Sequence, residues 1–255
     1  MPREIGKMSL MRPKEMNFNG GVIIIGSLLW EDDGGRGEWR RRYLKPVDER
    51  SSVPLRICYG RKSRTRECTY TMIFSNHDTT GVGQGCILKF LKSVDSFETI
   101  KEQALQLARA EHIWRREPAL LANEWGAVGL LLNPEFERMD NANTEMIRSQ
   151  WTETFHQYSR RFDHSQYCIE DEDPVIDEGG FLKIEWVTEM NDFHFLIGAP
   201  TVPDPKRPLN EKEIAQRMIV NEYRTYFDSN LKHHISTFQD DQILKWLTDL
   251  GPKEQ

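Results

Sequence analysis

Four consecutive β-branched residues, Val22 to Ile25, are the segment that most limits how this chain can fold. Gly20–Gly21 precede the run and Gly26–Ser27 end it, so the apolar stretch is short and bounded by turn formers. Such a run predicts a strand, and the absence of alternating polar residues predicts that both of its faces are buried. A membrane span is not expected, because no apolar stretch approaches the roughly 18 residues that a span needs.

Further strands and helices follow from the same kind of pattern. Strands are expected where short runs rich in β-branched or aromatic residues lie between turn formers, at Leu55–Tyr59, Thr69–Ser75, Gly85–Phe90 and Trp125–Leu132, and a hairpin at Leu182–Trp186 with Phe193–Gly198. Helices are expected where apolar residues recur every three or four positions, from an Asp95 N-cap onward, at Asn143–Phe162, from Asn210 to about Asn230, and at Gln239–Leu250. Residues 31–37 are expected to form a loop.

The order of these segments predicts a mixed α+β fold. We expect a small mixed sheet, mostly antiparallel or barrel-like, to cradle the helix that begins near Asp95, with a helical C-terminal extension packed on it. The expected organisation is an N-terminal arm at 1–19, a core domain at 20–135 and an α-rich extension at 136–255.

The composition narrows the function classes. The net charge of −6 argues against a broadly basic nucleic-acid binder. The polar N-terminus lacks the apolar centre of a signal peptide, and the four cysteines include no CxxC pair. A cytoplasmic location without disulfides or a metal site is therefore the expectation. The aromatic residues of the C-terminal helices are compatible with binding of a protein partner, or with a homo-oligomer, through these helices.

One carboxylate stands out on the helix after Asp95. Glu111 falls on the apolar side of the helical wheel, among Ala104, Leu107, Ala108 and Trp114. A charged carboxylate facing a core is costly, so it must be paired, neutralised or used. Burial raises the pKa of a carboxyl group towards the value that a general acid or base needs at neutral pH. Pairing with a buried Arg or Lys is the alternative explanation.

The turn after the first strand is a second candidate. A glycine there lets successive backbone N–H groups converge into an anion-binding nest, which would be formed by Gly26, Ser27, Leu28 and Leu29. Arg56 lies between two apolar residues and is expected to point inward, as the partner of Glu111 or of a substrate carboxylate. The other basic residues that follow it, at 61–66, would form either an anion pocket or a solvated turn.

Together these features resemble the gamma-glutamylcyclotransferase superfamily, particularly its ChaC-like branch. The run IIIGSLLW is similar to the YGSLxW loop of that family, with Ile25 where the family commonly has Tyr. Residues 85–88 stand at the family's next glycine-containing strand. Residues 104–111 are similar to the leucine-rich stretch that ends in the catalytic glutamate, with one residue inserted before Glu111.

The resemblance implies a reaction as well as a fold. The substrate would be a γ-glutamyl amide, cyclised to 5-oxoproline with release of an amine. Glu111 would act as general acid and base, residues 26–29 would bind the substrate, and no metal or organic cofactor would take part. Two other classes remain open at this point: a non-catalytic protein that binds a small anion or a nucleotide in the same cavity, and a protein-interaction module.

Overall fold

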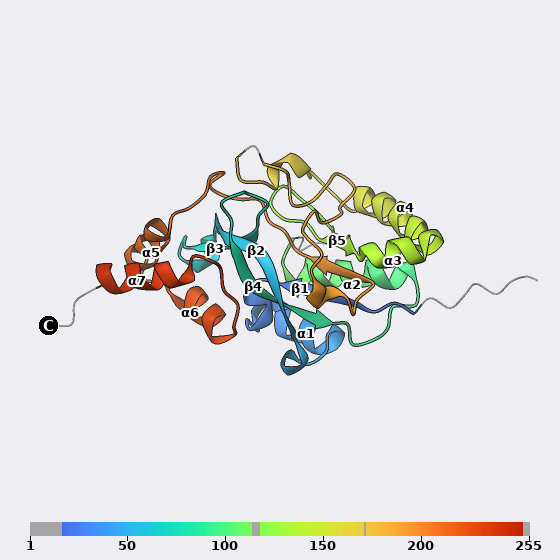
Figure 1. The fold of residues 1–255 in the computed structure, drawn as a ribbon, viewed down its shortest axis with the longest axis horizontal. Helices are drawn as coiled ribbons and strands as arrows, with labels where there is room; N and C mark the ends of the chain where they lie inside the picture. Colours follow the sequence, from blue (N-terminus) through green and yellow to red (C-terminus); the bar gives the residue numbers. More distant parts are fainter. Residues whose placement is uncertain (1–16, 114–117, 171, 252–255) are drawn as a thin grey trace, which may run out of the picture.

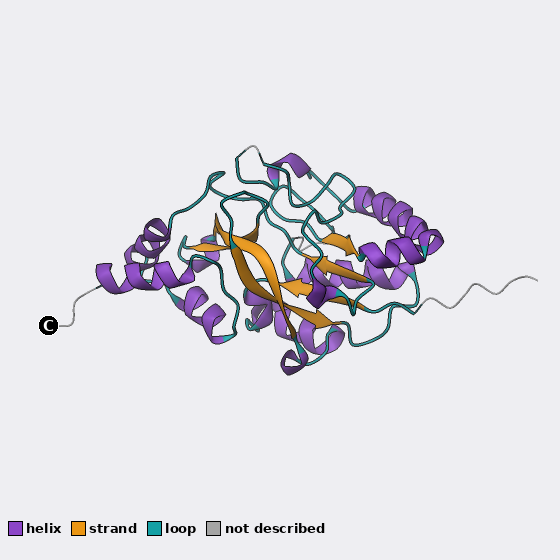
Figure 2. Cartoon of the chain, in the orientation of Figure 1, coloured by secondary structure: helices purple, strands orange, loops and turns teal. Residues whose placement is uncertain are grey.

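The computed structural model describes residues 17–113, 118–170 and 172–251, which form a mixed α/β fold around one six-stranded sheet (Figures 1 and 2). The sheet is curled into a half-barrel, and its strand order is β3-β2-β4-β1-β6-β5. The strands are β1 (Gly20–Ile24), β2 (Ser51–Lys62), β3 (Tyr70–Phe74), β4 (Val82–Lys89), β5 (Gly129–Leu132) and β6 (Phe195–Gly198).

The first strand has the central place that its composition indicates. β1 is buried along its whole length and is paired on both sides, with β4 antiparallel and with β6 parallel. Its side chains have nowhere to meet water, which explains why Val22, Ile23 and Ile24 follow one another without a polar break. Ile25 follows the strand, is partly exposed and lines the cavity described below. All the other strand pairs are antiparallel.

The prediction of a hairpin between Leu182–Trp186 and Phe193–Gly198 is wrong. Residues 182–186 form no strand; Leu182 makes a single bridge, to Ile176, and the preceding Phe181 makes one to Leu130. β6 instead pairs with β1 and β5. The boundary expected between residues 135 and 136 therefore does not follow an edge of the sheet, because a strand from the expected extension lies inside it.

The helices collect at the two ends of the sheet and beneath it (Figure 1). α5, α6 and α7 gather beside β3 and β2, whereas α3 and α4 lie at the opposite end near β5. Among the described residues the helices are α1 (Arg36–Tyr43), α2 (Phe97–Ala110), α3 (Pro134–Met139), α4 (Asn141–Gln157), α5 (Glu211–Val220), α6 (Thr225–Lys232) and α7 (Asp240–Leu250).

The apolar stripe of α2 is confirmed. Ile100, Ala104, Leu107 and Ala108 are all essentially buried, and α2 packs against α1 and α4. Trp114, expected on the same stripe, lies outside the described residues. The N-cap is Ser96 rather than Asp95: the Ser96 hydroxyl accepts the Thr99 N–H, while the Asp95 carboxylate accepts the hydroxyls of both residues.

Three further expectations meet a mixed outcome. The Asn210 N-cap is confirmed, but the helix that it starts ends at Val220, and α6 begins separately at Thr225. The loop expected at residues 31–37 is partly helical, since α1 begins at Arg36. Residues 1–16 of the expected arm lie outside the described residues, whereas Phe18 is buried and its N–H bonds to Val94 O at 2.8 Å.

No helix in the described ranges has the length and apolar character needed to cross a membrane.

Asp240, the first residue of α7, gives the fold a pH dependence. The residue is 4% exposed and its carboxylate accepts the Thr237 hydroxyl at 2.5 Å. Burial raises the pKa of Asp240 to about 6 from an ordinary value of 3.8. The folded state therefore binds a proton more tightly than the unfolded state does, and stability falls as pH rises between about 4 and 6.

We expect Asp240→Asn to remove this loss. An asparagine keeps the acceptor oxygen for Thr237 but carries no charge, so the variant should exceed the wild type by on the order of 2 kcal/mol at pH 7.5 and by little at pH 4.5. Urea unfolding at the two pH values measures this, with Asp249→Asn, exposed on the same helix, as the control. An equal difference at both pH values would contradict the assignment.

Candidate functional site

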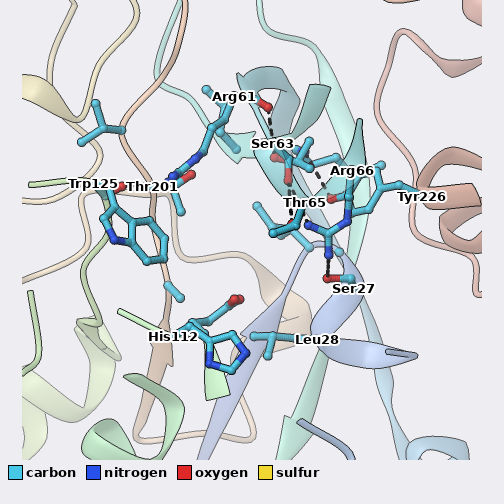
Figure 3. A pocket seen from close by; sticks show the side chains of 18 of the residues that line it. Ser27, Leu28, Arg61, Ser63, Thr65, Arg66, His112, Trp125, Thr201 and Tyr226 are labelled. Carbon is cyan, nitrogen blue, oxygen red and sulfur yellow. Dashed lines mark hydrogen bonds between the residues drawn. The ribbon is translucent and has the colours of Figure 1, made fainter. Parts of the chain in front are cut away.

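A cavity of about 690 Å³ opens where the turn after β1 meets α2, α6 and the hairpin of β2 and β3. Figure 3 shows Ser27, Arg66 and Tyr226 on one side of it, Trp125 on the other, and His112 near Leu28. The volume lies within the usual range of small-molecule sites. Glu111 and residues 26–28 of the predicted site all line this cavity.

The turn itself is a short 3-10 helix, Ser27–Leu29, with Gly26 before it. The N–H groups of Leu29, Trp30 and Glu31 bond back to the carbonyls of Gly26 and Ser27. The N–H groups of Ser27 and Leu28 take no part in these bonds, as at the start of any helix, and so are available to an acceptor. Leu29 is buried in the core and does not line the cavity.

Glu111 reaches the cavity because α2 ends at the residue before it. The Ile113 N–H bonds to Ala108 O and the His112 N–H to Arg109 O, both at 3.0 Å, and His112 has a φ of 57°. This is a Schellman motif, which fixes Glu111 as the C-cap residue. Ile113 anchors the turn in the core.

The charge state of Glu111 is set by two opposing effects. Burial raises the pKa of Glu111, while the guanidinium groups of Arg36, Arg66 and Arg61 lower it; burial prevails, and the pKa lies above its ordinary value. The nearest of the three cations is Arg36, whose Nη2 lies 3.3 Å from Glu111 Oε2. A quarter of the side-chain surface remains accessible, so the carboxyl group can meet a ligand in the cavity.

A second carboxylate, Glu31, ties the basic residues to the turn. Its Oε2 accepts from Arg36 and also from Arg66 Nη2 at 2.6 Å. The same Arg66 nitrogen lies 2.7 Å from Ser27 Oγ. Arg36 Nη1 donates to Glu31 and its Nε to the Ala110 carbonyl, so Glu111 is left with one contact to Arg36, from Nη2, rather than a bidentate pair.

Tyr226 of α6, in the C-terminal part of the chain, forms part of the cavity wall. Its hydroxyl oxygen accepts the Met72 N–H at 3.2 Å, and the Arg66 guanidinium lies 5.0 Å from its ring centroid. A Cβ at Gly26 would stand 2.5 Å from the same oxygen, so the turn has room for the phenol only because residue 26 is glycine. Burial raises the pKa of Tyr226, which keeps the hydroxyl protonated.

The expectation for Arg56 is wrong. Its guanidinium donates to the carbonyls of Thr80 and His77, at 3.2 and 2.7 Å, and it does not line the cavity. Arg36 pairs with Glu111 instead. Arg36 lies within the segment that was expected to form a loop. It also binds the Ala110 carbonyl, 74 residues further along the chain, and no local sequence pattern could predict a contact over that separation.

At the other end of the cavity Trp125 was missed, whereas Arg61 belongs to the basic segment at 61–66 that was expected to form either an anion pocket or a solvated turn. Arg61 follows a β-bulge, where β2 contributes the extra residue Gly60 between the pairs Tyr59–Met72 and Arg61–Thr71. A bulge re-aims the side chains beyond it, so the alternation of β2 gave no guide to Arg61. The Arg61 guanidinium lies 4.4 Å from the ring centroid of Trp125 and donates to its carbonyl at 3.0 Å.

The described residues contain no group of three His, Cys, Asp or Glu side chains arranged to hold a metal ion. Comparisons with protein-family models, curated proteins and solved structures found nothing that matches this chain. The chemistry available to the cavity therefore has to be judged from its own side chains: one carboxyl group with a raised pKa, two backbone donors, a phenol and a cluster of arginines.

Proposed function

We propose that the protein cyclises γ-glutamyl amides, releasing 5-oxoproline and an amine. The observation that carries the proposal is the position of Glu111, which lines the same cavity as the Gly26–Leu28 turn and has a raised pKa. An acid–base group and a donor nest on one cavity are what an intramolecular acyl transfer needs. The resemblance of the two segments to the gamma-glutamylcyclotransferase superfamily agrees with this proposal.

In the proposed reaction, Glu111 first takes a proton from the substrate's α-ammonium group. The free amine attacks the γ-carbonyl carbon of the same glutamyl residue, forming the C–N bond of a five-membered ring and an oxyanion. The N–H groups of Ser27 and Leu28 stabilise that oxyanion. Glu111 then gives this proton to the departing nitrogen as the original amide bond breaks. Ionised again, Glu111 takes the second proton from the ring nitrogen, which becomes the lactam N–H, and that proton leaves on the released amine as its ammonium group. The attack is intramolecular, so positioning supplies much of the rate.

The arginines give the cavity its preference for anions. Arg36, Arg61 and Arg66 line it together with Glu111, and the substrate's α-carboxylate needs such a partner. The same arginines are the observation that favours a second candidate function, in which the cavity binds a small anion without turnover. The two candidates differ only in whether Glu111 transfers a proton.

Product analysis tests the proposal. The full-length protein is incubated with a panel of γ-glutamyl amides that differ in their amine, and 5-oxoproline is measured by mass spectrometry against a sample without protein. We expect 5-oxoproline and the free amine in equal amounts from at least one compound. Binding of the panel without product would favour the anion-binding candidate, and neither binding nor product would contradict both.

A further inference from the structure

The cavity is larger than the glutamyl group requires, and its far end has a different character. Ser27, Leu28 and Glu111 form the reactive end, whereas Trp125 lies across the open space from Ser27 (Figure 3). With the glutamyl group at the reactive end, the group attached to its nitrogen has room to extend towards Trp125. This inference therefore rests on the proposed function for the glutamyl half of the ligand, and concerns the amine half.

Trp125 forms an aromatic platform whose backbone is held by hydrogen bonds. Its backbone N–H donates to Asn123 Oδ1 at 2.9 Å. Its backbone carbonyl accepts from Arg61 Nη1 at 3.0 Å and from the Val202 N–H at 2.9 Å. Asn123 is itself buried. The Arg61 guanidinium lies over the indole ring, yet the side chain remains partly exposed where it lines the cavity. A ligand therefore meets an indole ring that already packs against a guanidinium group, which favours stacking of a flat group.

The charge around this platform adds a second requirement. Arg61 and Lys62 at the end of β2 line the cavity, as does Arg64 in the turn that follows. Glu124 and Asp204 line it as well, and over the whole cavity five arginine and lysine side chains stand against three carboxylates. A positively charged amine substituent would be repelled by the guanidinium that already stacks on the ring, whereas a carboxylate would be attracted.

We propose that this end of the cavity is a subsite for the leaving amine, and that it selects amines carrying an aromatic ring together with a negative charge. The ring stacks on Trp125 and the negative group lies near Arg61 and Lys62. The substrates of this class are γ-glutamyl conjugates of aromatic amino acids.

Three matched compounds separate the ring from the charge. γ-Glutamyl-phenylalanine has both, γ-glutamyl-alanine has the carboxylate without the ring, and γ-glutamyl-2-phenylethylamide has the ring without the carboxylate. Binding is measured by calorimetry to full-length Glu111→Gln, so that no turnover is needed. We expect the phenylalanine conjugate to bind about tenfold more tightly than either of the others.

Two added substitutions locate the effect. Trp125→Ala in the Glu111→Gln background is expected to abolish the preference for phenylalanine over alanine, and Trp125→Phe to keep most of it. Lys62→Ala is expected to weaken the binding of the phenylalanine conjugate but not the binding of the phenylethylamide. Equal binding of the three compounds, no binding of any, or a ring preference that survives Trp125→Ala would overturn the inference.

Failure of the proposed function and failure of the subsite give different results. If the wild-type protein forms no 5-oxoproline while the ring preference is present and depends on Trp125, the aromatic subsite stands and the reaction does not. If the wild type cyclises all three compounds with equal kcat/KM and binds them equally, the reaction stands and the subsite does not.

Discussion

Glu111→Gln is expected to lower kcat for 5-oxoproline formation by about 10²- to 10⁴-fold, the usual contribution of a positioned general acid–base group. Glutamine has nearly the same shape and keeps an oxygen for the Arg36 guanidinium, which lies 3.3 Å from the carboxylate in the wild type. It cannot take a proton from the α-ammonium group or return one to the leaving amine. Substrate binding should therefore persist while turnover is lost.

The control is Glu102→Gln, which makes the same chemical change at an exposed position of α2. This variant should keep the wild-type kcat. Circular dichroism and calorimetric binding of a γ-glutamyl amide check that Glu111→Gln is folded and still recognises its ligand. Equal product from the wild type and Glu111→Gln would show that the carboxyl group does not carry the reaction.

The pH profile is a second readout of the same prediction. Glu111 accepts a proton only when ionised, and burial holds its pKa above the ordinary value of 4.5 against the effect of Arg36, Arg66 and Arg61. We therefore expect kcat/KM to fall as pH decreases through a midpoint above 4.5. A profile without this acidic limb would assign the base to another group.

Gly26→Ala is expected to destabilise the protein by about 1–3 kcal/mol and to abolish cyclisation, because the added methyl group overpacks a filled site. The backbone at Gly26 is extended, with a φ of −176°, so strain in the main chain is not the cause. The cause is the Tyr226 hydroxyl oxygen, 2.5 Å from the position of the new Cβ. Moving that oxygen would break its bond to the Met72 N–H and displace the turn that carries Ser27.

A double-mutant cycle identifies the clash. Tyr226→Phe removes the hydroxyl group, and the next nearest ring atom lies 3.4 Å from the Cβ position, an ordinary contact. The variant that combines Gly26→Ala with Tyr226→Phe should therefore be more stable than the sum of the single effects, by 1 kcal/mol or more in urea unfolding. Gly126→Ala, whose Cβ would meet nothing closer than 3.5 Å, is the control and should change stability little. Strict additivity would mean that Tyr226 is not the obstacle.

Local patterns predicted the parts of the fold that depend on local chemistry. The central strand, the buried stripe of α2 and the Asn210 cap all follow from side chains a few residues apart, because burial and capping act at that range. The N-cap of α2 was misplaced by one residue, since Asp95 and Ser96 are both good capping residues and both take part.

The end of α2 shows where this reasoning stops. The helical wheel placed Glu111 among the core residues of a continuing helix, whereas the helix ends at Ala110 and a turn directs the carboxyl group into the cavity. A glycine usually marks such an ending, and here the residue with a positive φ is His112. The sequence showed that Glu111 is a carboxylate on an apolar stripe, but it did not show the direction of its side chain.

By itself, then, the sequence determined which segments form the central strand and the amphipathic helix, and that one carboxyl group and one glycine turn are out of keeping with a simple core. Only the tertiary structure decided what meets them. Arg36, Arg66 and Tyr226 come to the cavity from a helix start, a turn and the C-terminal helices. β6 joins the sheet from a segment with no strand partner nearby in sequence. The physical reason is that periodicity and capping report contacts within a few residues, whereas the partners of a buried charge are chosen by long-range packing, which leaves no local pattern.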